Sequence, residues 1–250
     1  MRLDGLVLAV AFMTRLPVGG RGRGIAATDL ADAAPWLPAT GIAVGSVVVS
    51  LCALGAQIGP AVGALLGLVG WVAVTGALHL DGLGDSADAA GAAHGDPTRY
   101  IAVLKDPNAG NFAVAAIALQ LIAKTVLLAA VVGHGNTALA AVVLAATWAR
   151  FGALVWASAL APLGDGLAAR MRGGITRRTI FVQGALLLAA SLVLAPALVL
   201  APLVIWLGVV TWRRGPVVIN GDGLGALIEV TESVLMLAAA AGLSLGFVWL

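Results

Sequence analysis

Three aspartates are spaced so that one helix would place them on the same face. Asp81, Asp85 and Asp88 stand at positions i, i+4 and i+7, which line up along one side of an α-helix. Carboxylates this close repel one another, and a bound cation relieves the repulsion. Carboxylate oxygens are hard ligands that suit Mg²⁺, Mn²⁺ or Ca²⁺. This acidic stripe therefore predicts a metal site, and the alternative is a solvated acidic helix start.

Glycines and a histidine accompany the acidic stripe. Gly82 and Gly84 leave one side of the helix narrow, which would let another helix or a phosphate approach. His79 lies about 200° around the helix from Asp81. It therefore faces elsewhere, and it fits a packed or hydrogen-bonded histidine as well as a catalytic one.

Two polar segments farther along the chain could complete such a site. Asp106 precedes Pro107, which suits the first turn of a helix, so Asp106 would cap that helix or reach the metal. Lys105 beside a helix amino end outlines a phosphate site. Near the carboxyl end, a glycine-rich turn carries Asp222 and would give the site a second carboxylate wall.

Two basic residues, Lys124 and Arg150, lie well inside long apolar runs. A charge at that depth in a bilayer costs several kcal/mol unless it is paired or hydrated, and snorkelling to the interface would need a long reach. We therefore expect a shared anionic partner inside the helix bundle. Two roles stay open for the pair, which are holding the helices together and binding a substrate phosphate.

These residues require a scaffold embedded in a membrane. Of the 250 residues, 10% are charged and 61% are hydrophobic, whereas about 25% are charged in a soluble domain. That composition excludes a soluble domain and a nucleic-acid-binding protein and predicts a polytopic membrane protein. Seven apolar runs are candidate spans: 39–58, 61–79, 112–132, 137–160, 180–195, 197–212 and 233–250.

The predicted fold is all-α, with about seven transmembrane helices and a short amino-terminal interfacial helix. The apolar segment from Leu3 to Met13 is too short to cross a bilayer and lacks the cleavage site of a signal peptide, so we expect it to lie in the interface. Pro196 and Pro202 leave open whether 180–212 is one kinked helix or two shorter ones.

The charges predict the orientation of the chain. Apart from Lys124 and Arg150, every charged residue falls in 1–38, 80–111, 161–179 or 213–232, which share one side if the spans alternate. That side is cytoplasmic by the positive-inside rule. We therefore expect a multi-pass membrane protein whose working surface faces the cytoplasm. The basic loop of Arg170, Arg172, Arg177 and Arg178 is explained by topology alone or by contact with a substrate phosphate.

The residues from Thr75 to Asp88 read TGALHLDGLGDSAD and resemble the signature of the adenosylcobinamide-GDP ribazoletransferase family, also called cobalamin synthases. Further matches follow in the family's order: FMTRLP at 12–17, Lys105 and Asp106 with Gly110, Lys124 and Arg150 within spans, and GDGLGA at 221–226 with Glu229. The resemblance covers nearly the whole chain and implies a single membrane-embedded catalytic domain over residues 1–250. Asn220 departs from the family's usual Thr, Pro107-Asn108 from its Ser-Arg, and 163–168 keeps only part of an acidic run.

The resemblance implies the last joining step of the cobalamin nucleotide loop. Adenosylcobinamide-GDP and α-ribazole, or its 5′-phosphate, give adenosylcobalamin, or its 5′-phosphate, and GMP in a Mg²⁺-dependent transfer. Asp81, Asp85 and Asp88 would be catalytic, with Asp85 or Asp88 accepting the hydroxyl proton. These three, with Asp106 or Asp222, would hold Mg²⁺ across the diphosphate. Substrate-binding roles are implied for His79, Gly82, Lys105, Gly110, Lys124 and Arg150. The expected partners are the substrates and the lipid bilayer, and the oligomeric state stays open.

Two rival functions remain at this stage. A CDP-alcohol phosphotransferase that makes a lipid also uses aspartates and a metal, but its signature has Ala-Arg where this chain has Gly84-Asp85. A cation-coupled transporter would place its site near the bilayer midplane. Here the carboxylates are expected at one membrane face and none in mid-span, which argues against a transporter.

Overall fold

The computed structural model describes residues 3–18, 27–215 and 218–246, and these residues are almost entirely helical. The α-helices are α1 (Leu3–Met13), α2 (Ala27–Ala33), α3 (Leu37–Ala56), α4 (Pro60–Thr75), α5 (Leu78–Ala93), α6 (Pro97–Val103), α7 (Asn111–Gly133), α8 (Ala140–Ala159), α9 (Leu167–Arg172), α10 (Arg177–Leu194), α11 (Ala201–Arg214) and α12 (Gly221–Ser244). Three short 3₁₀ segments are η1 (Ala34–Trp36), η2 (Asn136–Leu139) and η3 (Pro196–Leu200). Two-residue strands β1 (Ala161–Pro162) and β2 (Val218–Ile219) pair in parallel.

Six helical segments of the described chain are long and apolar enough to cross a membrane, or seven if one bent pair counts as a span. This confirms the predicted all-α, multi-pass architecture. The ambiguous stretch 180–212 forms two helical segments, Arg177–Leu194 and Pro196–Arg214. Pro196 begins the second one, because proline lacks the N–H that would continue the first helix.

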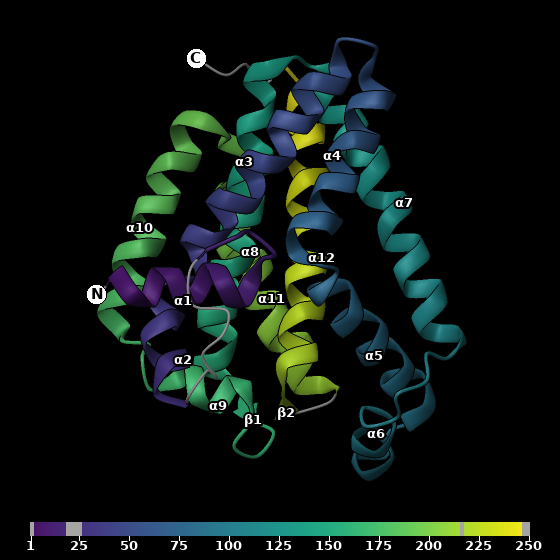
Figure 1. Ribbon diagram of the computed structural model, residues 1–250, viewed down its shortest axis with the longest axis vertical. Helices are drawn as coiled ribbons and strands as arrows, with labels where there is room; N and C mark the ends of the chain where they lie inside the picture. Colours follow the sequence, from purple (N-terminus) through teal and green to yellow (C-terminus); the bar gives the residue numbers. More distant parts are fainter. Residues whose placement is uncertain (1–2, 19–26, 216–217, 247–250) are drawn as a thin grey trace.

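The predicted span 61–79 runs past the end of its helix. Helix α4 ends at Thr75, and α5 leaves it at an angle of 85°. Gly76 and Ala77, with φ angles of 63° and 60°, adopt the left-handed conformation at the break, which no α-helix can continue through. The break sends the acidic stripe away from the axis of α4, as Figure 1 shows.

The last span is also placed differently from the prediction. Helix α12 runs from Gly221 to Ser244, whereas the expected span was 233–250, of which residues 247–250 lie outside the described part of the chain. The sequence interpretation assigned Glu229 and Glu232 to a loop because they are charged. Both carboxylates are in fact buried within the helix, so the expectation that no Asp or Glu lies in mid-span was wrong.

Helix α8 forms the centre of the bundle, and nearly all of its residues are buried. Glycines of α3 allow a close approach to it: a Cβ at Gly45 would lie 2.6 Å from the Cα of Val143, a contact typical of packed membrane helices. Helix α12 packs against α5, α7 and α8.

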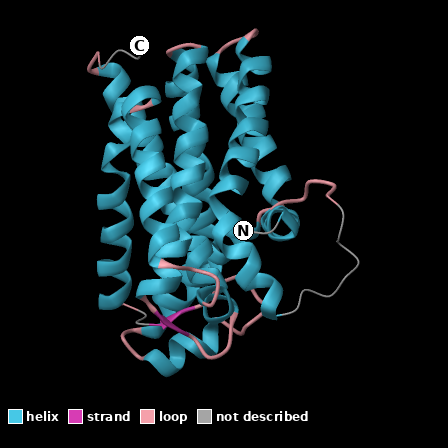
Figure 2. Cartoon of the chain, turned by 90° about the vertical axis from the view of Figure 1, so that its left-hand side faces the viewer, coloured by secondary structure: helices cyan, strands magenta, loops and turns pink. Residues whose placement is uncertain are grey.

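The predicted amino-terminal helix forms as α1 and lies across the bundle rather than along it, as Figure 1 shows and Figure 2 confirms from the side. The elements α5, α6, α9, β1 and β2 gather at one end of the molecule, and the α3–α4 and α7–η2 turns at the other (Figure 1). The alternation of spans inferred from the charges agrees with this arrangement.

Candidate active site

Helix α5 carries the acidic stripe, and its three aspartates differ in exposure. Asp81 is exposed, Asp85 is partly exposed and Asp88 is buried. Asp81 of α5 and Asp222 of α12 line one cavity, so carboxylates from the two helices border a common space. Asp222 lies in the first turn of α12, and its role as a second carboxylate wall of a metal site stays a prediction.

Asp88 is held by the amino end of α7. Its Oδ2 accepts a hydrogen bond from the Gly110 N–H at 2.5 Å, and its Oδ1 accepts one from the Ala113 N–H at 2.9 Å. Four N–H groups at a helix amino end lack partners within the helix, and Asp88 satisfies two groups there from another helix. The prediction that Asp106 caps this helix was wrong, because α7 begins at Asn111, well after Pro107.

Asp106 forms a local turn instead of joining the carboxylates. It accepts hydrogen bonds from the backbone N–H and the side-chain amide of Asn108. These bonds, the backbone one first, hold the pKa of Asp106 below its usual value. Lys105 and Asp106 are both exposed, and neither lines the cavity beside Asp81 and Asp222.

Helices α5 and α12 touch directly beside that cavity. A Cβ at Gly82 would lie 2.7 Å from the carbonyl oxygen of Asp222, and one at Gly225 would lie 3.2 Å from the Cα of His79. Gly82 therefore admits a helix, one of the two roles that the sequence left open. A cavity of about 110 Å³ opens next to this contact, with Asp81, Asp222 and His79 among its lining residues.

The first turns of α5 and α12 both border this cavity. Leu78 and His79 open α5, and Gly221 and Asp222 open α12. The amino end of a helix carries a partial positive charge and unpaired N–H groups, so it attracts phosphate and carboxylate groups. Two such ends beside one cavity suit a ligand with more than one phosphate.

The carboxylates do not form a preassembled metal cage. Within the described ranges, no group of three or more His, Cys, Asp and Glu side chains is gathered closely enough to hold a metal ion. Mg²⁺ rarely uses such a cage, because it is commonly bound by one or two carboxylates together with substrate phosphates and water. Asp81 and Asp222 on one cavity fit that pattern of donors.

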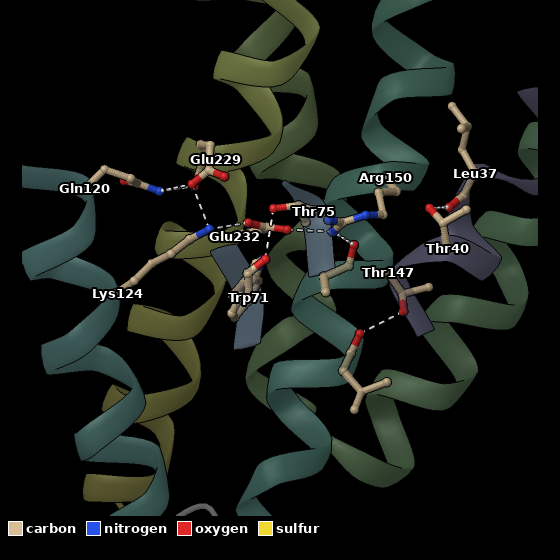
Figure 3. Close-up of polar contacts among 12 residues, drawn as sticks. Leu37, Thr40, Trp71, Thr75, Gln120, Lys124, Thr147, Arg150, Glu229 and Glu232 are labelled. Atoms are coloured by element: carbon tan, nitrogen blue, oxygen red, sulfur yellow. Dashed lines mark hydrogen bonds and ion pairs between the residues drawn. The ribbon is translucent and has the colours of Figure 1, made fainter. Parts of the chain in front are cut away.

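Lys124 and Arg150 have the shared anionic partner that the sequence predicted, and it is Glu232. The Lys124 Nζ lies 2.5 Å from Glu232 Oε2, and the Arg150 Nη1 lies 2.6 Å from Glu232 Oε1. Figure 3 shows the Glu232 carboxylate between the two basic groups. All three side chains are at most 2% exposed, so this is a buried ion network.

The same network extends to Glu229 and Trp71. Lys124 Nζ lies 2.7 Å from Glu229 Oε2 and 4.2 Å from the centre of the Trp71 ring. The side-chain amide of Gln120 also donates to Glu229 Oε2 at 2.8 Å (Figure 3). Lys124 and Arg150 are thus paired with two carboxylates of α12, Glu229 and Glu232. The positive charges are balanced within the protein.

Sequence reasoning named Glu229 in the carboxyl-terminal motif but missed that Glu229 and Glu232 pair with the buried cations, although a signal was present. Glu229 and Glu232 are three residues apart and so share a helix face, and they are the only glutamates in the chain. Two cations deep in the bilayer require counter-charges. A last span that began before Glu229 would have placed both glutamates at a depth where they could supply them.

Arg172 of the basic loop and Arg213 of α11 have a structural role. Arg172 Nε donates to the carbonyl oxygen of Ala157 at 2.9 Å, and Arg213 Nη2 donates to that of Ala159 at 2.8 Å. These bonds satisfy carbonyl groups at the carboxyl end of α8, where a cation also meets the negative end of the helix dipole.

The bundle and its cavity define a multi-pass membrane protein with a site suited to a phosphorylated ligand. The family model described as cobalamin-5-phosphate synthase matches residues 5–240, and the chain belongs to that family. It is 47% identical to the adenosylcobinamide-GDP ribazoletransferase of Novosphingobium aromaticivorans, over 95% of this chain and 96% of that one. The proteins of the same name from Thiobacillus denitrificans and Laribacter hongkongensis are 43% and 48% identical over at least 95% of each chain.

No solved structure matches the chain. The family membership confirms the resemblance seen in the sequence. It favours that family over the two rival functions, the lipid-making phosphotransferase and the transporter.

Proposed function

We propose that the chain is an adenosylcobinamide-GDP ribazoletransferase. It would join adenosylcobinamide-GDP to α-ribazole, or to its 5′-phosphate, and release GMP. The relatives that carry this name match nearly the full chain at 43–48% identity. The observation that carries the proposal is the cavity between α5 and α12, which brings Asp81, Asp222 and two helix amino ends together.

The diphosphate of adenosylcobinamide-GDP would lie at the mouth of this cavity. Its negative charge suits the amino ends of α5 and α12. Asp81 and Asp222, with Asp85 close by, would hold Mg²⁺ against the phosphate oxygens, and the bound ion would neutralise their charge. Asp88 is a weaker candidate ligand, because its two oxygens already accept N–H bonds from α7.

The reaction requires positioning more than covalent catalysis by the protein. A ribose hydroxyl oxygen would attack the phosphorus on the cobinamide side, and the bond to GMP would break. Asp85 would accept the hydroxyl proton, because Asp88 is engaged as a helix cap. Lys124 and Arg150 are not needed for the diphosphate, since Glu229 and Glu232 already balance their charge.

The site would face the cytoplasm from a bacterial inner membrane. The support is the distribution of Lys and Arg over segments at one end of the bundle, which the positive-inside rule assigns to the cytoplasm. Nucleotide-linked substrates of the cytoplasm could then reach the cavity directly.

A direct assay tests the proposal. Protein purified in detergent is mixed with adenosylcobinamide-GDP, α-ribazole and Mg²⁺, and GMP release is measured with and without EDTA. We expect release that needs both substrates and stops when the metal is chelated. The variant in which Asp81 and Asp222 both become Asn is the matched negative control. Absence of GMP from the folded parent protein would overturn the proposal.

A further inference from the structure

The cavity beside α5 and α12 has two chemically different parts. Asp81 and Asp222 give it a polar rim, whereas Phe12, Met13 and Ile228 belong to its apolar walls. Phe12 and Met13 come from α1, the helix that lies across the bundle (Figure 1). Binding of a metal and a diphosphate would explain the carboxylates at the rim. It would not explain the apolar walls of the cavity.

A buried histidine lines the same cavity. His79 is 3% exposed, and neither of its ring nitrogens has a hydrogen-bond partner in the part of the chain that the structure describes. A neutral imidazole carries one donor and one acceptor. Leaving both unsatisfied in a protein interior is costly, so a buried histidine of this kind points to a ligand with polar groups.

The ligand that fits must combine an apolar ring with hydroxyl groups. Guanine carries several donors and acceptors, which walls such as Phe12 and Ile228 would leave unpaired at a cost. A methylated benzimidazole leaves only one ring acceptor to be satisfied, so it loses less than guanine against such walls, and a ribose attached to it offers hydroxyls to His79.

We propose that this cavity is the acceptor-nucleoside site, where the apolar walls bind the methylated benzimidazole of α-ribazole and His79 hydrogen-bonds its ribose. This inference rests on the proposed function, because it assigns one of the two substrates of that reaction. It gives His79 a substrate-binding contact to the acceptor and separates it from the diphosphate at the rim.

Two variants test the site with matched controls. His79→Phe keeps a ring and removes both nitrogens, and His134→Phe makes the same change at an exposed position near the opposite end of the bundle. Ala153→Leu fills the cavity, which Ala153 lines, and Ala118→Leu adds the same atoms on an exposed face of α7. Each full-length protein is purified in detergent.

The first measurement is thermal stabilisation by α-ribazole alone, without Mg²⁺ or the second substrate. We expect α-ribazole to stabilise the parent and both controls, and to stabilise neither cavity variant. The ligand-free His79→Phe protein should be at least as stable as the parent, because an unsatisfied polar group has been removed. Failure of α-ribazole to stabilise the parent would overturn the proposal.

The second measurement is the KM for each substrate in GMP release. His79→Phe should raise the KM for α-ribazole by about tenfold, as expected for a lost buried hydrogen bond, and leave that for adenosylcobinamide-GDP unchanged. Unchanged α-ribazole KM in both cavity variants would overturn the site while the proposed function stands. Stabilisation by α-ribazole that depends on His79, in a parent that releases no GMP, would instead reject the function and keep the site.

Discussion

The three aspartates of the acidic stripe meet different surroundings along one helix. Asp81 borders the cavity, Asp85 is partly exposed, and Asp88 is hydrogen-bonded to the amino end of α7. Their common helix face in the sequence pattern suggested equal roles. The structure separates a cavity-facing carboxylate from one that connects two helices.

Alanine substitutions distinguish these roles. Asp88→Ala removes a cap from two N–H groups and should lower the free energy of unfolding by about 1–2 kcal/mol. Asp81→Ala should leave unfolding nearly unchanged, since Asp81 is exposed, but should lower GMP release by at least about 100-fold. Unfolding in mixed SDS micelles and the GMP assay measure the two effects. Equal loss of stability in both variants would contradict this division.

The buried ion network depends on one carboxylate more than on the other. Glu232 contacts both Lys124 and Arg150, whereas Glu229 contacts only Lys124 among the two cations. Removing one partner of a buried pair leaves an uncompensated charge, which is far more costly than replacing the whole group by apolar residues.

We therefore expect Glu232→Gln to lower the free energy of unfolding by about 3–5 kcal/mol. Glu229→Gln is the matched control and should cost clearly less, because Lys124 keeps Glu232 as a partner. The same SDS titration measures both variants. If the two substitutions had equal effects, Glu232 would not be the shared partner in solution.

At the scale of elements, the site depends on how closely α5 approaches α12. Gly82 and Gly84 are both glycines of α5, yet they face different neighbours. The Cβ of an alanine at position 82 would meet the Asp222 backbone, with its Cα 2.8 Å away, whereas at position 84 it would meet the tip of the Ile117 side chain at 2.9 Å. A backbone cannot move aside as a side-chain tip can.

Gly82→Ala should therefore push the two helices apart, cost about 1–3 kcal/mol of stability and reduce GMP release. Gly84→Ala is its control and should be tolerated, since alanine also favours the helix by up to about 1 kcal/mol over glycine. Thermal unfolding and the GMP assay compare the pair. Normal activity of Gly82→Ala at normal stability would mean that the α5–α12 contact does not shape the site.

Local patterns predicted most elements, and distant contacts decided the rest. The spans at 112–132 and 137–160 lie within α7 and the η2–α8 segment to about one residue, because apolar runs ended by glycine or polar residues mark helix ends. The break at Gly76 was missed since both sides of it are apolar. The cap on α7 was unpredictable because its acceptor, Asp88, lies 22 residues before Gly110.

At the scale of the whole molecule, charge and architecture agree on a single orientation. The charged elements α5, α6 and α9 gather at one end, and the turns around Gly59 and Gly135 lie at the other (Figure 1). The apolar surface between them includes large exposed side chains such as Leu119, Phe181 and Trp206, as expected for a surface in lipid.

Fusion reporters check this orientation. A reporter placed after Gly95 or after Gly174 should report a cytoplasmic position, and one placed at Gly135 should not, by the positive-inside rule. Reporter activity in intact cells gives the answer for each site. A periplasmic signal at Gly95 would place the carboxylates of α5 on the wrong side for the proposed reaction.

The position of Glu232 in the chain also has a consequence for biogenesis. It follows Arg150 by 82 residues and Lys124 by 108, and synthesis proceeds from the amino end. Helices α7 and α8 therefore enter the bilayer with cations whose counter-charge has not yet been made, at a cost that persists until α12 arrives. Helix α12 completes the charge balance, so nascent chains that stop before it carry two unmatched cations in the bilayer.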